Sequence, residues 1–415
     1  MVPKGWTHTT FDKHVDCLTG FAFKSDNYSN AEDDIRLLRG DNIEPGNLRW
    51  RDAKYWPKGE LNNLEKYYLA DGDFVIALDR TWVSSGLKVA EVTPSDLPCL
   101  LVQRVARIRA KATLEQSLLR QYFSGHKFEQ HVKSVQTATA VPHISPNDIK
   151  EFTVSLPPIL EQKKIAKILS TWDKAITTTE QLLANSQQQK KSLMQQLLTG
   201  KKRLLDNNGV RFVGEWKYVV LGCVFEKISN GVTYDAKSLS GLPVTRIETI
   251  STGEIDFKKV GWAPDSENTK RFKLEIGDIL YSHINSLEHI GRVAYFNDNR
   301  SLYHGMNLLL LRTKKQNNSL FFYHLLNSQV GKKYAKLYAK SAVNQASIST
   351  TDIKAFKVYI PESEEQQKIA TVLSTADQEI ASLQQKLDAL KLEKKALMQQ
   401  LLTGKRRVKI DLMVL

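Results

Sequence analysis

Residues 193–201 read LMQQLLTGK, and residues 397–405 read LMQQLLTGK again. The offset of 204 residues between these copies also aligns residues 161–204 with residues 365–408, where 24 of 44 positions are identical by direct count. The match continues upstream without a gap, pairing SPNDIKEFTVSLP with STTDIKAFKVYIP. Self-similarity at a fixed offset over this length indicates that the chain contains one structural plan twice.

Each copy predicts a variable globular domain followed by a near-constant helical segment. The upstream stretches end in Phe-x-Val-x-Leu/Ile-Pro, the alternating pattern of a strand closed by proline. We therefore predict an α+β fold with two globular domains separated by an antiparallel coiled coil of two long helices, related by a pseudo-two-fold repeat. The predicted boundaries are 1–157 and 205–361 for the globular domains, 158–204 and 362–408 for the helices, and 409–415 for a tail.

The near-constant segments carry an apolar stripe with steps of four and three residues, as the a and d positions of a coiled coil require. Neither segment contains Pro or Gly before Gly200 and Gly404, which stand where a helix C-cap is expected. Lys190 and Lys394 occupy equivalent stripe positions, where polar residues often set register. Two independent amphipathic helices, each packed on its own domain, are the alternative. The predicted pairing residues are Ile165, Leu169, Trp172, Ile176, Leu183, Leu193, Leu197, Ile369, Leu373, Ile380, Leu383, Leu387, Leu390, Leu397 and Leu401.

Charge and composition bound the class of protein. The chain has 59 Lys and Arg against 45 Asp and Glu, a net charge of +14 that favours polyanionic partners such as nucleic acid. Three widely spaced cysteines predict neither a disulfide framework nor a cysteine-rich zinc site. No apolar run approaches the roughly 18 residues of a membrane span, and MVPKGWTHTT lacks the apolar segment of a signal peptide. We expect a cytoplasmic protein with no membrane partner.

The sequence offers little for catalysis. It contains no GxGxxG motif for a dinucleotide or methyl donor, no Asn/Asp-Pro-Pro motif for a flipped base, and no HxxxH pair for a metal. LLTGKKR resembles the end of a phosphate-binding loop, but Gln195 stands where the first glycine should be. Glu364 and Glu365 are interpreted as an exposed charge pair. These observations favour a binding protein with no catalytic residues and no metal.

The repeated segment carries a family resemblance. Two variable halves, each followed by P-x-x-x-E-Q-x-K-I-A-x-x-L-S-x-x-D and a long helix ending in LMQQLLTGK, resemble the specificity subunits of type I restriction-modification systems. The resemblance covers essentially the whole chain. Its signature residues are Pro157, Glu161, Gln162, Lys164, Ile165, Ala166, Leu169, Ser170 and Asp173, repeated as Pro361, Glu365, Gln366, Lys368, Ile369, Ala370, Leu373, Ser374 and Asp377.

The resemblance implies a non-catalytic subunit in which each variable half is a target recognition domain reading half of a bipartite site in double-stranded DNA. Because the halves differ in sequence, the site should be asymmetric. Two methyltransferase subunits are expected to dock on the helices and bring S-adenosylmethionine, and motor-nuclease restriction subunits to add ATP and magnesium. The alternatives are a coiled-coil protein without preference among duplexes and a DNA enzyme that acts without partners.

Candidate DNA contacts lie in loops beside the predicted sheets, at residues 79–86, 136–145, 282–292 and 340–349. In the major groove, Arg and Lys recognise guanine, Asn and Gln recognise adenine, and hydroxyls contact either base. The predicted base readers are Arg80, Trp82, Ser84, Ser85, His283, Asn285, Ser286, Arg292, Asn344 and Gln345, with Arg36, Arg39 and Arg246 as second choices. The predicted phosphate contacts, which position without specifying sequence, are Lys127, Lys270, Arg271 and Lys273.

Overall fold

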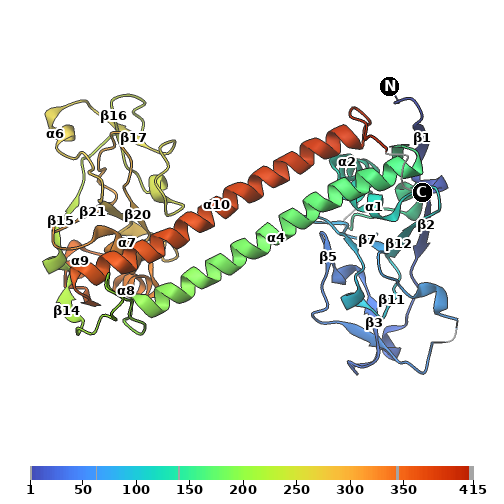
Figure 1. Cartoon of the computed structure of the whole chain (residues 1–415), viewed down its shortest axis with the longest axis horizontal. Coiled ribbons are helices and arrows are strands. Elements are labelled where there is room, and N and C mark those ends of the chain that lie inside the picture. Colours follow the sequence, from blue (N-terminus) through green and yellow to red (C-terminus); the bar gives the residue numbers. More distant parts are fainter. Residues whose placement is uncertain (1, 62, 139–140, 343–344, 411–415) are drawn as a thin grey trace. The chain divides into compact units, whose positions relative to one another are not determined.

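The computed structural model describes residues 2–61, 63–138, 141–342 and 345–410. The chain divides into two compact units: unit 1, formed by Met1–Glu180 and Lys386–Leu415, and unit 2, formed by Gln181–Gln385. The boundary falls within the two long helices, α4 (Ile159–Leu197) and α10 (Ser363–Leu401), which are green and red in Figure 1. Each unit therefore contains one globular domain together with one end of each long helix.

The elements of unit 1 that precede α4 are β1 (Thr7–Thr10), β2 (Val15–Thr19), β3 (Ile35–Leu38), β4 (Ile43–Glu44), β5 (Asn47–Leu48), β6 (Lys54–Trp56), β7 (Phe74–Ala77), β8 (Trp82–Val83), β9 (Gly86–Leu87), β10 (Val89–Glu91), β11 (Cys99–Leu101), β12 (Val105–Ala110), α1 (Gln116–Phe123), α2 (His126–Val135), α3 (Pro146–Lys150) and β13 (Thr153–Leu156). A four-stranded antiparallel sheet has the order β10-β7-β12-β2, and a second sheet has the order β11-β3-β6. The run FVIA of β7 is buried along its whole length, as expected for a strand covered on both faces. The strand predicted before the proline, β13, pairs with β1.

The elements of unit 2 between the long helices are β14 (Lys217–Val220), α5 (Leu221–Val224), β15 (Phe225–Asn230), β16 (Leu242–Val244), β17 (Gly261–Ala263), α6 (Glu267–Lys270), β18 (Ile279–Tyr281), β19 (Ile284–Asn285), β20 (Val293–Tyr295), β21 (Leu309–Thr313), α7 (Ser319–Asn327), α8 (Gln329–Tyr338), β22 (Lys340–Ala342), β23 (Gln345–Ser347), α9 (Thr350–Ala355) and β24 (Lys357–Ile360). The main sheet, β20-β18-β21-β15, repeats the strand order of the main sheet of unit 1. β24 pairs with β14 as β13 pairs with β1. The two globular domains therefore share the topology of their main sheets, whereas their smaller sheets differ.

A buried aspartate fixes the turn before the central strand of each main sheet. Asp73 is 2% exposed and accepts hydrogen bonds from Arg109 Nε and Nη2 at 2.6 and 2.7 Å. Asp278 is 1% exposed and accepts from the same two atoms of Arg312 at 2.8 Å each. Because a buried carboxylate without a partner is costly, these bidentate pairs explain why both copies have a Gly-Asp turn here, at residues 72–73 and 277–278.

The ends of the long helices belong to the cores of the two domains. In unit 1, Ile165, Leu169 and Leu401 lie in one apolar cluster with Phe11 and Phe128. In unit 2, the equivalent cluster joins Leu197, Ile369 and Leu373 to the paired rings of α7. The predicted stripe therefore does two things: it pairs the helices, and it seats each pair of helix ends on a domain.

Within each unit the two helices run antiparallel. In unit 1, Asp173 pairs with Lys394 at 2.5 Å and Glu180 pairs with Lys391 at 2.8 Å, so the partner number falls as the residue number rises. In unit 2, Ser186 Oγ donates to Glu379 at 3.1 Å, and Lys190 pairs with Asp377. All fifteen predicted pairing residues are buried or half-buried.

The start of each long helix is held by the tail that follows the other one. Glu161 accepts from Arg407 Nε and Nη2, both at 2.7 Å, and from Trp6 Nε1 at 3.1 Å. Glu365 accepts from Arg203 Nε and Nη2 at 2.6 and 2.7 Å, and from the indole of Trp216 at 3.2 Å. Glu365 is 1% exposed, so the interpretation of Glu364 and Glu365 as an exposed charge pair is wrong for Glu365.

The helices end at Leu197 and Leu401, seven residues before the predicted boundaries at 204 and 408. Gly200 (φ +69°) and Gly404 (φ +70°) adopt the left-handed conformation that terminates a helix and that other residues rarely adopt. The chain then turns back, which brings Arg203 and Arg407 to their glutamates.

Candidate nucleic-acid interface

The two loops predicted to contact DNA in the first half come together in unit 1. Asp79 forms an isolated bridge with His143, and the Arg80 N–H donates to the carbonyl of Pro142 at 2.9 Å. Arg80 itself is exposed and has φ +46°, so its backbone is held in an unusual conformation for a non-glycine residue. The start of the loop 79–86 therefore lies beside residues 142–143 of the second loop.

The loop after Arg80 is the hairpin β8–β9, whose tip carries the exposed side chains of Ser84 and Ser85. Trp82 is half-buried against the core of unit 1, and the Lys133 ammonium lies 4.5 Å from the centroid of its ring. Trp82 therefore anchors the hairpin, and the arginine and the two serines are the side chains presented to solvent.

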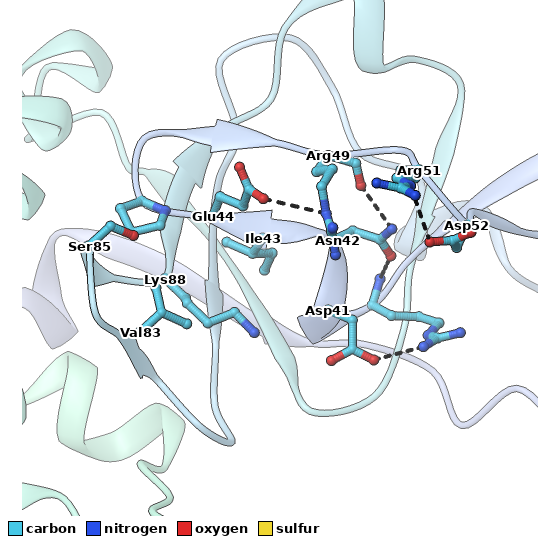
Figure 2. Close-up of a pocket in the computed structure, with 12 residues that line it drawn as sticks. Asp41, Asn42, Ile43, Glu44, Arg49, Arg51, Asp52, Val83, Ser85 and Lys88 are labelled. Atoms are coloured by element: carbon cyan, nitrogen blue, oxygen red, sulfur yellow. Dashed lines mark hydrogen bonds and ion pairs between the residues drawn. The ribbon is translucent and has the colours of Figure 1, made fainter. Parts of the chain in front are cut away.

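A cavity of about 650 Å³ opens beside this hairpin (Figure 2). Its walls come from the turn before β4, from hairpin β4–β5 and from hairpin β8–β9. Asn42 braces the first two, because its Oδ1 accepts from the Arg39 N–H and its Nδ2 donates to the Arg49 carbonyl, each at 3.0 Å. The lining residues are Arg39, Asp41, Asn42, Ile43, Glu44, Pro45, Arg49, Arg51, Asp52, Val83, Ser85 and Lys88.

The lining of the cavity includes Arg39 and Ser85, which the sequence predicted as DNA contacts. It also includes three cations that were not predicted, Arg49, Arg51 and Lys88. Nothing in the pattern around Arg49 or Arg51 sets them apart from other surface arginines. Lys88 follows Leu87 in a short run with the composition of a strand. Nothing in that run predicts that the lysine lines a cavity.

Arginines of the cavity are paired with exposed carboxylates. Arg39 lies 2.8 Å from Asp41, and Arg49 lies 3.4 Å from Glu44. The side chain of Asp41 is 74% exposed and that of Glu44 is 44% exposed. Such pairs contribute little to stability and are readily exchanged for another anion.

The second-choice reader Arg36 lies in β3 and points elsewhere. Its Nη2 donates to the carbonyls of Ser95 and Leu97 at 3.1 and 2.9 Å, and its guanidinium lies 4.7 Å from the ring centroid of Trp50. These contacts hold β3 to the segment that leads into β11. Arg36 therefore has a structural use in unit 1.

In unit 2 the two predicted loops pair within one small sheet, β19-β23-β22. Asn285 lies opposite Ala346, and the exposed side chain of Gln345 lies on the neighbouring strand. Ser286 is exposed at the end of β19. The amide of Asn285 is oriented by contacts to Ser282 Oγ at 3.0 Å and to the Ser286 N–H at 2.9 Å. The predicted contact Asn344 lies outside the described residues.

Two predicted readers of unit 2 are turned inward. His283 is 7% exposed, and burial lowers the pKa of its imidazole to about 4. Arg292 Nη1 donates to the carbonyl of Ser251, and its Nη2 lies 2.9 Å from His289 Nδ1. The structure therefore favours structural roles for His283 and Arg292 and leaves the exposed Ser286 and Gln345, with the half-buried Asn285 beside them, as the candidate contacts.

The remaining predicted contacts lie on exposed or half-exposed surface. Lys270 pairs with Asp265 at 3.3 Å and with Glu267 at 3.1 Å, and these two carboxylates raise the pKa of its ammonium. Arg246 lies 3.3 Å from Glu248. The other three, all exposed, are Lys127 on α2, Arg271 and Lys273.

No helix in the described part of the chain combines the length and apolar character needed to cross a bilayer. Within the same residues, no three His, Cys, Asp or Glu side chains gather in a way that could hold a metal ion.

The two units repeat one main-sheet plan and carry different polar loops, which is the architecture of a two-domain protein built by internal duplication. The family model of the type I restriction modification DNA specificity domain matches the chain twice, over residues 18–186 and 214–392. The chain therefore belongs to the type I restriction-modification specificity family.

Relatives and a solved structure agree with this assignment. The chain is 42% identical over 194 residues to the MjaX specificity subunit of Methanocaldococcus jannaschii, a match that spans 46% of each protein and so less than half of that relative. It is 24% identical over 383 residues to the type I restriction enzyme EcoKI specificity subunit of Escherichia coli, covering 89% of this chain and 81% of that one. The crystal structure of a type I restriction-modification S subunit from M. genitalium aligns with a TM-score of 0.63 at 15% identity, covering 97% and 96% of the two chains, and so shares its fold.

Proposed function

We propose that the chain is the DNA-recognition subunit of a type I restriction-modification complex and reads an asymmetric bipartite site, one half-site per domain. The observation that carries this proposal is one scaffold with two different exposed loop sets. Unit 1 presents Arg80, Ser84 and Ser85, whereas unit 2 presents Asn285, Ser286 and Gln345. Arg favours guanine and Asn or Gln favours adenine, so different half-sites are expected.

The chain would act through partners and not as an enzyme. Two methyltransferase subunits would dock on the helix pair, because each unit offers the same signature residues around equivalent helix ends. Exposed apolar side chains on the helices, Leu160 and Leu392 in unit 1 and Leu182 in unit 2, offer contacts for such partners. Restriction subunits would join through the methyltransferases. S-adenosylmethionine, ATP and magnesium would be held by those partners.

Single-molecule sequencing of modified bases tests this function directly. DNA is compared from cells that express the chain with its methyltransferase partner and from cells that lack only this chain. We expect a bipartite, asymmetric methylated motif with a fixed unread spacer that disappears in the deletion. Unchanged methylation in the deletion, with the partner shown to be active, would refute the proposal.

A further inference from the structure

The cavity of unit 1 contains one buried cation that is not paired as its neighbours are. Lys88 is 7% exposed, and Figure 2 shows its ammonium pointing into the cavity on the same side as the Asp41 carboxylate. Among the described residues, no ion pair or side-chain hydrogen bond is recorded for Lys88, whereas Arg39 and Arg49 each have a carboxylate partner. Lys88 is therefore a recessed cation whose stem is buried and whose ammonium opens into the cavity, without a fixed carboxylate partner in the described part of the chain.

Charges of both signs surround Lys88. Burial lowers the pKa of its ammonium; Asp41 offsets part of this effect, and Arg80 and Arg49 lower the pKa further. The three cations come from three segments: Arg49 follows β5, Arg80 precedes β8, and Lys88 lies between β9 and β10. A bound anion would relieve their mutual repulsion, and perturbed groups of this kind are characteristic of ligand sites.

The cavity is held in shape without any ligand. The Lys88 N–H donates to the Thr81 carbonyl at 2.8 Å, and the Lys88 carbonyl accepts from the Ala77 N–H at 3.1 Å. On the opposite wall, the Gly46 N–H donates to the Val89 carbonyl at 2.9 Å. The backbone on both sides of the ammonium is therefore fixed, and an anion that enters meets a preorganised donor.

We propose that this cavity binds one backbone phosphate of DNA, with Lys88 as its central ligand and Arg49 beside it. The inference rests on the proposed function. A phosphate fits better than a base edge because a recessed ammonium is a point charge that recognises an anion without reading a pattern of donors and acceptors. With one phosphate anchored in the cavity, the DNA backbone would place the adjacent DNA groove at the tip of hairpin β8–β9.

The test uses the full chain assembled with its methyltransferase partner, on a duplex carrying the methylated site and on one with the unit 1 half-site scrambled. Lys88→Met should weaken binding to both duplexes by about tenfold and reduce the slope of log affinity against log salt by about 0.9. Lys88→Arg, which keeps the charge, should stay close to the original affinity. Lys58→Met removes the same charge from an exposed position of unit 1 outside the cavity and should leave affinity and slope unchanged.

A phosphate scan locates the contact. Neutral methylphosphonates are placed one at a time along the duplex, and one position that weakens binding by the original chain should become silent in Lys88→Met. The melting temperature of Lys88→Met should stay equal or rise, because an unpaired buried charge has been removed. A lowered melting temperature that accounts for the loss of binding would overturn the inference.

Three other results would also overturn it. A changed half-site preference in Lys88→Met would make Lys88 a base reader. If inorganic phosphate raises the melting temperature of the original chain but Lys88→Met binds DNA normally, the cavity holds a free anion. If Lys88→Met binds with unchanged affinity and salt slope and inorganic phosphate has no effect on the melting temperature, the cavity holds neither a DNA phosphate nor a free anion. In each case chain-dependent methylation by the original protein would leave the proposed function intact, whereas its absence would refute that function separately.

Discussion

At the scale of the residue, an arginine predicted to contact DNA has two uses in this fold. Arg36 and Arg292 bind backbone carbonyls of their own domain, whereas Arg80 is exposed. Nothing in the local sequence predicts this difference. What separates them is a carbonyl brought close by a distant segment, as the carbonyl of Leu97 is brought to Arg36 across 61 residues. Local sequence could therefore not predict which of the candidate side chains are accessible.

Substitution of the accessible residues should act on one half-site at a time. Arg80→Ala should relax specificity in the half-site of unit 1 by about 1–3 kcal/mol, because a bidentate base contact is worth that amount. Asn285→Ala should do the same for the other half-site. Methylation measured over a library of sites would check both. Arg36→Ala is the control: it should destabilise unit 1 without changing the preferred sequence, and loss of assembly by Arg80→Ala would assign Arg80 a structural role instead.

Three buried histidines should make unit 2 sensitive to acid. Burial lowers the pKa of His283 and His304 to about 4 and that of His324 to about 3. Their pKa values in the unfolded chain are near 6.5, so the unfolded chain binds more protons between the two values. Stability should be complete above about pH 6.5 and fall as the pH approaches 4, by on the order of 3 kcal/mol for each histidine.

Urea-dependent proteolysis at several pH values, with fragments assigned to each unit by mass spectrometry, measures this effect. Between pH 6.5 and 4.5, the resistance of unit 2 to proteolysis should fall more steeply than that of unit 1. His324→Gln should reduce this dependence of unit 2 on pH, because it removes one of the three buried imidazoles. Equal slopes for the two units would contradict the assignment of acid sensitivity to these histidines.

At the scale of the element, the long helices were the most predictable part of the molecule. The apolar residues of these helices recur every three or four residues, and left-handed glycines mark the helix ends. Both the period and the glycines can be read in the sequence. The short strands and the cavity between hairpins β4–β5 and β8–β9 have no such signal. Strands of two residues are defined by partners that tertiary packing supplies, and such partners are invisible in a single local window.

The stripe lysines should set the pairing of the helices. Lys394 is 13% exposed and pairs with Asp173, whose carboxylate is 24% exposed. Asp173→Lys should destabilise unit 1 by about 2 kcal/mol, because it places two ammonium groups together at a half-buried position. Adding Lys394→Asp should restore most of the loss if the pairing is antiparallel as described. Urea unfolding of both variants measures the coupling, and additive losses would refute a direct pair.

At the scale of the whole molecule, unit 1 is completed by a segment from the far end of the sequence, whereas unit 2 is one continuous stretch. The predicted boundaries divide the chain into consecutive pieces, whereas unit 1 includes residues from both ends. The repeat could predict that two domains and two helices exist. It could not predict that the tail after α4 packs on the second domain and the tail after α10 on the first. These arrangements depend on contacts such as Glu161–Arg407, which cross 246 residues.

Removal of the C-terminal tail should therefore weaken the N-terminal domain. Deletion of residues 402–415 takes away Arg407 and leaves Glu161 buried beside Trp6 without its cation. We expect unit 1 to lose about 2–3 kcal/mol, less than for a fully buried pair because Arg407 is 43% exposed.

The rate at which a thiol reagent reaches Cys99, which is fully buried in unit 1, measures the opening of that unit. The rate should rise in the deletion and return to its original value when residues 402–408 are restored. A deletion that exposes unit 2 and leaves Cys99 protected would contradict this arrangement.

The contact between the two distant ends of unit 1 has a consequence for how the gene could be arranged. Arg407 Nη1 donates to the carbonyl of Lys4 at 2.9 Å, and a side chain on Gly404 would collide with Pro3. Helix α4 leads from the first globular domain to the second, and helix α10 leads from the second domain back to the first. The chain is therefore connected like a closed ring that is cut at one point. A circular permutant with residues 3 and 408 joined by a short linker, and a new opening near Asn208, would keep every contact described above.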